Sequence, residues 1–215
     1  MSKSVYSIVL DDDVIKMIDI AAARQNTSRS NLINRILARH ISLPTTETMI
    51  SDIYNSINDF LKDSSSLALQ ILGSGSLINM RSALSYKYNP SVKYTVEIFE
   101  KGDYLGKLKV SLRSQNRQVL TIFDDFFYLW SQLEKQYAGL DDKEFTVADG
   151  RYARLLRCTD CNDYSDYGLT IGAYVDLMDR CMKEFFSRYT LSPSRAAKSA
   201  GGIYISDITD DIHKI

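Results

Sequence analysis

The feature that most constrains this chain is residues 4–41, which read as one short strand followed by two helices. Five of six positions from Val5 to Leu10 are β-branched, aromatic or large apolar residues, and an acidic run follows at residues 11–13. Acidic residues suit the first turn of a helix, where they meet the positive end of its dipole. A strand is therefore predicted immediately before a helix, with no second strand nearby.

Two amphipathic helices are predicted after that strand. Apolar residues recur at spacings of three and four from Val14 to Ala22, which gives the first helix one apolar stripe. Asn26 suits a helix stop, and Ser28 is placed to accept a backbone N–H at the start of the next helix. The apolar face of the second helix consists of Leu32, Ile33, Ile36, Leu37 and Ile41.

A lone strand leaves two edges unpaired, and pairing with the same strand of a second copy is the economical solution. This predicts an antiparallel two-stranded ribbon and an obligate homodimer. A two-stranded ribbon also fits the major groove of double-stranded DNA.

The module resembles the ribbon-helix-helix (Arc/MetJ/CopG-type) DNA-binding superfamily over about a fifth of the chain. The resemblance rests on Leu10, Ile18-Asp19, Ala22, Ser28-Arg29-Ser30 and Leu32-Ile33. It implies that the start of the second helix clamps a backbone phosphate, as helix N-termini do for anions. The implied DNA contacts are Lys3, Val5, Ser7, Val9, Ser28, Arg29 and Ser30. The implied dimer core is Tyr6, Ile8, Leu10, Ile33, Ile36 and Leu37.

The groove face of the expected ribbon departs from the family pattern, which is usually polar or basic. Val5 and Val9 can offer only apolar contacts, for example to thymine methyl groups, and Ser7 is the one hydrogen-bonding side chain there. A dimerisation module with little affinity for DNA is the alternative interpretation.

The charge balance is uneven along the chain. Residues 1–42 carry six basic and four acidic residues, which leaves 20 basic and 23 acidic residues for the remainder. This split favours DNA contact through the N-terminal module alone and argues against a second nucleic-acid surface of the basic-stripe kind. No apolar run reaches the length of a membrane span and no signal peptide is recognisable, so we expect a cytoplasmic, nucleoid-associated protein.

Three segments are predicted: a DNA-binding and dimerisation module at 1–42, an α+β domain at 45–190, and a tail at 191–215 that is flexible or forms a strand-like arm. In the α+β domain, period-two apolar residues predict a hairpin over 94–112, and Asp149-Gly150 predicts a second one. Helices are predicted over 49–61, 119–137 and 169–189, and residues 73–76 as a turn. An antiparallel sheet covered by helices follows from this order.

No catalytic constellation, cofactor site or metal site is predicted, so we do not expect an enzyme. Cys158 and Cys161 form a lone CxxC pair, which could bind zinc only if a dimer supplied a second pair, and Cys181 falls on the apolar stripe of a helix. A row of basic residues could line a pocket for an anionic ligand or simply be the exposed face of a sheet. That row is Lys107, Lys109, Arg113 and Arg117.

The expected function is a dimeric transcriptional regulator, a repressor, whose α+β domain binds a small molecule or a protein partner, with higher oligomers on DNA also open. An antitoxin-type autoregulator is one alternative, although a domain of this size exceeds what toxin binding needs. A plasmid-partition or nucleoid-associated protein, in which the larger domain mediates assembly, is another.

Overall fold

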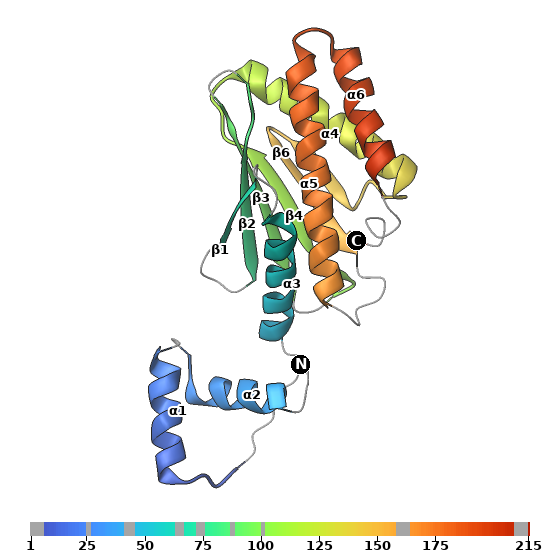
Figure 1. Ribbon diagram of the computed structural model, residues 1–215. Coiled ribbons are helices and arrows are strands. Elements are labelled where there is room, and N and C mark those ends of the chain that lie inside the picture. Colours follow the sequence, from blue (N-terminus) through green and yellow to red (C-terminus); the bar gives the residue numbers. More distant parts are fainter. Residues whose placement is uncertain are drawn as a thin grey trace. The chain divides into compact units, whose positions relative to one another are not determined.

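The chain divides into two compact units, Met1–Thr48 (unit 1) and Met49–Ile215 (unit 2), which are described separately below. The computed structural model is drawn in Figure 1. It describes residues 7–24, 27–40, 46–62, 67–71, 76–86, 89–99, 102–157, 164–208 and 215.

Unit 1 contains the two predicted helices. α1 (Asp12–Arg24) opens with two acidic residues, and α2 (Arg29–His40) is capped by Ser28, whose hydroxyl accepts the backbone N–H of Asn31 at 3.2 Å. The helices and the Ser28 cap are therefore confirmed. Asn26, the expected helix stop, lies outside the described residues.

The predicted ribbon strand is not present as a strand in this single chain. Residues 7–11 form neither helix nor strand, and Lys3, Val5 and Tyr6 lie outside the described residues. The first regular element of the described chain is thus a helix. A ribbon strand would take all its ladder hydrogen bonds from a second copy, so one chain alone gives this segment no partner to pair with.

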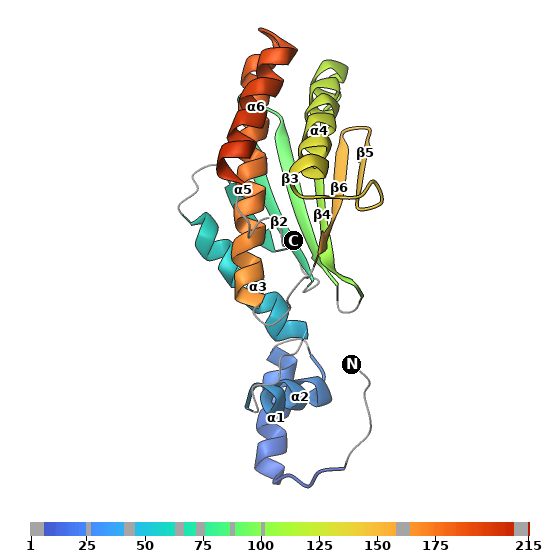
Figure 2. The same cartoon turned by 90° about the vertical axis from the view of Figure 1, so that its right-hand side faces the viewer.

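Unit 2 is built on a six-stranded antiparallel sheet in the order β1-β2-β3-β4-β6-β5 (Figure 2). The strands are β1 (Leu67–Ile71), β2 (Leu77–Ala83), β3 (Ser91–Ile98), β4 (Tyr104–Leu112), β5 (Phe145–Ala148) and β6 (Arg151–Arg157). This confirms the α+β class with an antiparallel sheet.

Both predicted hairpins are present. β3 pairs with β4, with Tyr94 opposite Val110 and Val96 opposite Leu108. β5 pairs with β6 through Asp149 and Gly150, whose φ angles are 46° and 71°. Two consecutive positive φ angles are the backbone of the tight turn that matches strand twist, and this is why Asp-Gly was informative.

The hairpin of β1 and β2 was not predicted. Its residues mix small and apolar side chains without clear alternation, and β2 buries three consecutive residues from Ile78 to Met80. Asn79 lies on the polar side of the strand but is buried there, where its amide oxygen accepts a hydrogen bond from Thr95 at 2.9 Å. A strand buried on both sides loses the period-two signal on which the prediction depended.

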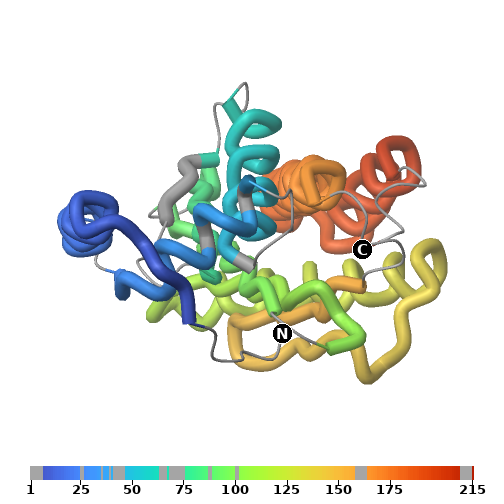
Figure 3. Tube along the Cα trace, turned by 90° about the horizontal axis from the view of Figure 1, so that it is seen from below, coloured from blue at the N-terminus to red at the C-terminus, as the bar shows by residue number. Residues whose placement is uncertain are grey.

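Four helices accompany the sheet: α3 (Thr46–Leu61), α4 (Arg117–Tyr137), α5 (Tyr164–Tyr189) and α6 (Pro193–Asp207). α3 and α5 lie on one side of the strands in the view of Figure 3. Residues from all four helices join the inward-facing residues of the sheet in one core cluster. Helices therefore cover one face of the sheet, and the other face is left to polar side chains.

The apolar stripe of α3 packs within unit 2. Ile53 and Ile57 are fully buried, and α5 approaches closely because Gly168 and Gly172 face α3. A Cβ at Gly168 would lie 2.6 Å from the Ile53 carbonyl oxygen, which no real side chain tolerates. The stripe therefore packs onto its own domain.

The prediction for the tail is wrong over residues 193–207, which form α6 instead of a flexible or strand-like arm. Ser192 caps the helix, Pro193 occupies its first turn, and α6 belongs to unit 2. Ala196, Ala200 and Tyr204 recur every four residues and are buried. Their small side chains let α6 pack closely, so a segment with few large apolar residues still has a buried face.

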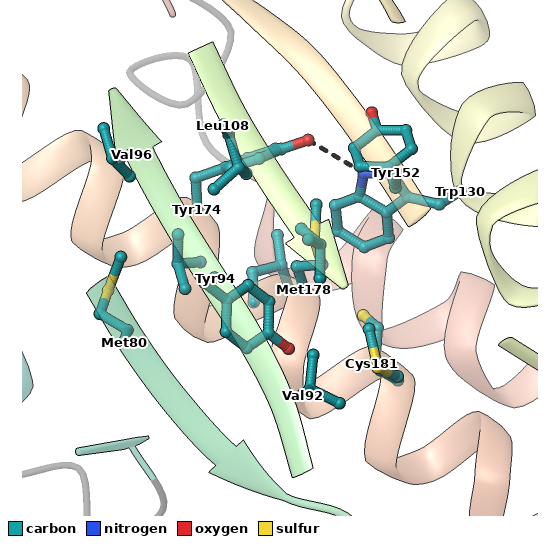
Figure 4. Close-up of a cluster of buried hydrophobic side chains, with 14 of the residues drawn as sticks. Met80, Val92, Tyr94, Val96, Leu108, Trp130, Tyr152, Tyr174, Met178 and Cys181 are labelled. Carbon is teal, nitrogen blue, oxygen red and sulfur yellow. Dashed lines mark hydrogen bonds between the residues drawn. The ribbon is translucent and has the colours of Figure 1, made fainter. Parts of the chain in front are cut away.

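Aromatic residues dominate the core between sheet and helices (Figure 4). Trp130 donates its indole N–H to the hydroxyl of Tyr174 at 2.9 Å, and Phe127 stacks on Tyr152 with ring centroids 4.5 Å apart. Cys181 is buried among them, as predicted. Burial raises the pKa of the Cys181 thiol to about 12, so the group is a neutral packing residue.

Candidate nucleic-acid interface

Unit 1 has very little hydrophobic core of its own. Among its described residues only Ala22, Leu32 and Ala38 are buried apolar side chains. Seven large apolar residues are exposed: Ile8, Val9, Val14, Met17, Ile20, Ile36 and Leu37. A helix pair with this much exposed apolar surface needs a partner surface to be stable in water.

The described residues of the expected ribbon are mostly exposed. Val9 is 101% exposed, whereas Ile8 is 57% exposed and Leu10 is partly covered. Ser7 is exposed as well. The exposure of the single chain therefore does not separate the expected DNA-facing set (Ser7 and Val9) from the expected inward set (Ile8 and Leu10).

The expected dimer-core residues of α2 are open in the single chain. Ile36 and Leu37 are each about half exposed, and Ile33 is partly exposed. These three lie three and four residues apart, so they form one continuous apolar strip on α2.

The residues expected to hold a phosphate lie at the start of α2. Ser28, Arg29 and Ser30 are all exposed. The backbone N–H of Asn31 donates to the Ser28 hydroxyl, and the backbone N–H of Leu32 donates to the Ser28 carbonyl. The amides of Arg29 and Ser30 belong to the first turn, where no carbonyl of the same helix can accept them, and both are available to an anion.

The Arg29 side chain is half exposed but is bound to α1. Its guanidinium donates to both carboxylate oxygens of Asp19 on α1, at 2.6 and 2.5 Å. These hydrogen bonds hold the pKa of Asp19 below its usual value and raise the pKa of Arg29. The pair joins the two helices of unit 1, a role for Arg29 that the sequence analysis did not foresee.

Unit 2 holds a second candidate site, a groove of 680 Å³ between α5 and α6. Its lining includes Arg180, Arg188, Arg195, Lys198, Ser199, Gly202, Ile203, Ser206 and Asp207. Gly202 borders open space, since a Cβ there would meet no atom within 4 Å. The volume is in the range of small-molecule pockets, although the groove is shallow.

Cations outnumber carboxylates around this groove. Arg180 is held by Asp176 and Asp207, at 2.8 and 2.6 Å. Arg195 and Lys198 are exposed and pair with no carboxylate of the described residues. The groove could therefore take an anionic ligand. Sequence analysis missed it because residues 191–215 were expected to be flexible or extended, whereas the Arg195, Lys198 and Gly202 spacing is that of one helix face.

Only two of the four basic residues expected to form a row lie on the sheet. Lys107 and Lys109 lie on the polar face of β4, where Lys109 contacts Glu97 at 2.6 Å. Arg113 follows β4, and Arg117 is the first residue of α4. The groove between α5 and α6 includes none of these four side chains.

The remaining sequence candidates add no site. Cys158 and Cys161 lie outside the described residues, and no metal-binding cluster of His, Cys, Asp and Glu occurs within the described part of the chain. In the same part of the chain no helix is both long and apolar enough to cross a membrane. Comparisons with protein-family models, with curated proteins and with solved structures give no match.

Proposed function

We propose that this chain is a sequence-specific DNA-binding transcriptional regulator, a repressor, that acts as a dimer through an N-terminal ribbon-helix-helix module. Unit 1 supplies the ribbon and the phosphate clamp. Unit 2 is a sensory domain that alters DNA binding when a ligand or partner binds.

The observation that carries the proposal is the exposed apolar surface of unit 1. Ile8, Ile36 and Leu37 have no core to enter within their own unit. A second copy of the same module would bury them on both sides of a two-fold axis, and the ribbon strands would then satisfy each other's backbone groups. Such a dimer would account for two features of the single chain: the predicted strand has nothing to pair with, and the helix pair has almost no core.

The proposed DNA contact is supported by the exposed side chains and backbone amides that the dimer core would not bury. Val9 and Ser7 are exposed, and the amides of Arg29 and Ser30 open the second helix. Side chains on a ribbon read base edges, while amides at a helix start hold the backbone and set the register.

The sensory role of unit 2 is supported by the groove between α5 and α6. Arg195 and Lys198, which pair with no carboxylate of the described residues, suit a small ligand with a phosphate or carboxylate group. Binding there would change DNA affinity only if the ligand favours one of two states of the protein, with typical coupling of about 1–3 kcal/mol.

Two measurements on the full-length protein test the proposal. We expect sedimentation to show a dimer, and genome-wide mapping of bound sites to recover a short motif with two-fold symmetry. A monomeric protein that enriches no sequence would contradict it. A dimer that enriches DNA without a common motif would instead favour the nucleoid-associated alternative.

A further inference from the structure

The sheet face that no described helix covers is strongly basic. Five residues define this surface, which we call the basic face: Arg81 on β2, Lys93 on β3, Lys107 and Lys109 on β4, and Arg151 on β6. On each of these strands the neighbouring residues point the other way and are buried in the core, so the five cations share one side of the sheet. The one carboxylate on this side of these strands is Glu97, among the described residues.

Strand register places the cations beside one another. Arg81 lies directly opposite Lys93, Lys93 opposite Ser111, and Ser111 opposite Arg151. Like charges directly opposite on neighbouring strands are destabilising. The fold therefore keeps an unfavourable pair, Arg81 and Lys93, that a bound anion would relieve.

Most of these cations have no internal partner. Lys109 pairs with Glu97, but Arg81, Lys93, Lys107 and Arg151 pair with no carboxylate of the described residues. On the helix side, by contrast, Lys183 pairs with Asp179 at 2.6 Å and Arg154 with Glu134 at 2.8 Å. Unit 2 is thus near neutral as a whole yet positive on one face, which the net charge of the sequence concealed.

We propose that the basic face binds the sugar-phosphate backbone of duplex DNA. Neighbouring strands lie about 4.8 Å apart, so the row from Arg81 to Arg151 crosses roughly 14 Å, enough to reach more than one phosphate. Between the cations the face presents Thr95, Ser111 and Ala153. The Thr95 hydroxyl donates to Asn79, and the Ser111 hydroxyl can donate to a phosphate. Single strands are bound through aromatic stacking platforms, and these positions carry no ring.

This site goes beyond the proposed function, because it is a second DNA contact in the domain assigned to sensing. It needs neither the ribbon of unit 1 nor a particular base sequence. Contact through phosphates alone adds affinity to every sequence equally and is strongly salt-dependent.

The test compares two charge-matched double variants of the full-length protein. The first is Lys93→Gln with Arg151→Gln on the basic face. The control is Lys143→Gln with Arg117→Gln, at the two ends of the α4 region and outside both the basic face and the groove, which removes the same kinds of charge from unit 2. Both are expected to fold, since all four side chains are at least partly exposed and pair with no carboxylate of the described residues; thermal melting checks this.

The measured quantity is the affinity for a mixed-sequence DNA duplex across a salt series. We expect the basic-face variant to bind more weakly and its log-log salt slope to fall by about 0.9 for each lost phosphate contact, while the control keeps the wild-type slope. Equal changes in both variants, or no change in the first, would overturn the proposal. Polyglutamate and unlabelled duplex are also compared as competitors of DNA binding to the wild type. If polyglutamate displaces the DNA as effectively as the duplex does, the proposal is overturned in favour of an acidic protein partner.

Discussion

Glu134 on α4 and Arg154 on β6 form an ion pair in the middle of unit 2, with Oε2 and Nη1 2.8 Å apart and side chains 0% and 1% exposed. Tyr204 of α6 donates its hydroxyl to Glu134 at 3.0 Å, and the Arg154 guanidinium lies 4.6 Å from the ring centre of Tyr174 on α5. The pair thus joins the sheet to three helices. Burial raises the pKa of Tyr204, and the nearby Glu134 carboxylate raises it further, so its hydroxyl stays a donor.

Removing either partner of this pair should strongly destabilise unit 2. Glu134→Leu leaves a buried guanidinium without its carboxylate, and we expect a loss of about 3–5 kcal/mol in the free energy of unfolding, measured with denaturant. The double variant Glu134→Leu with Arg154→Met should lose less than either single variant, because no buried charge remains. Additive losses would show that the two charges are not coupled.

The close contact of α3 and α5 predicts opposite outcomes for two glycines. Gly168→Ala forces a Cβ against the Ile53 carbonyl and should cost about 1–3 kcal/mol. Gly202→Ala places a Cβ in open space within α6 and should be neutral or stabilise by up to about 1 kcal/mol. Thermal unfolding of the two variants side by side tests the packing, and equal losses would refute it.

Substitutions at two neighbouring residues of unit 1 should distinguish dimerisation from DNA contact. Ile8→Asp places two carboxylates in the proposed dimer core, a penalty of several kcal/mol, and should produce monomers that do not bind the operator. Val9→Asp should leave the dimer intact, since Val9 is fully exposed, and should weaken DNA binding by repelling phosphates. Sedimentation and gel-shift assays measure the two effects. A dimer in both variants would exclude the ribbon as the interface.

The Asp19–Arg29 pair predicts that Asp19 restrains a phosphate contact. Asp19→Asn releases the guanidinium at the start of α2, and we expect tighter binding to all DNA sequences, with a salt slope steeper by about 0.9. If Arg29 leaves Asp19 when DNA binds, Arg29→Ala should weaken binding to all DNA sequences and make the salt slope shallower. If Arg29 stays on Asp19, the substitution should change neither the affinity nor the slope. An unchanged slope in both variants would mean that Arg29 has only a structural role.

Acid should weaken unit 2 through Glu144. Hydrogen bonds from Arg157, at 2.7 and 2.5 Å, hold the pKa of Glu144 below its ordinary 4.5 against the opposing effect of burial. The resulting stability is complete above pH 4.5, where the carboxyl is charged in both states, and is lost as the pH falls through the lower folded pKa. Unfolding at several pH values should therefore show a wild-type advantage over Arg157→Gln that shrinks below pH 4.5.

Elements with local chemical signals were predictable from the sequence. Ser28 marked the start of α2 through its hydroxyl, Asp149-Gly150 marked a turn through its backbone preference, and period-two residues marked β3 and β4. Each of these signals acts within a few residues of chain, so no tertiary information was needed.

Features set by distant contacts were not predictable in the same way. α6 depends on small residues, Ala196 and Ala200, finding a close fit against helices formed earlier in the chain. Arg154 follows the strand alternation between Tyr152 and Leu156, which hinted that it faces inward, but only the fold supplies Glu134 as its partner. The basic face likewise exists only once four strands are in register.

The packing of α3 against α5 has a consequence for the order of events during synthesis. Gly168 follows Ile53 by 115 residues, and at ~5–20 residues per second α5 leaves the ribosome roughly ten seconds after α3. For that interval Ile53 and Ile57 have no glycine-lined surface to cover them, although the hairpins of the sheet can already form. The nascent chain should therefore be most prone to aggregation, and most dependent on chaperones, just before its last two helices emerge.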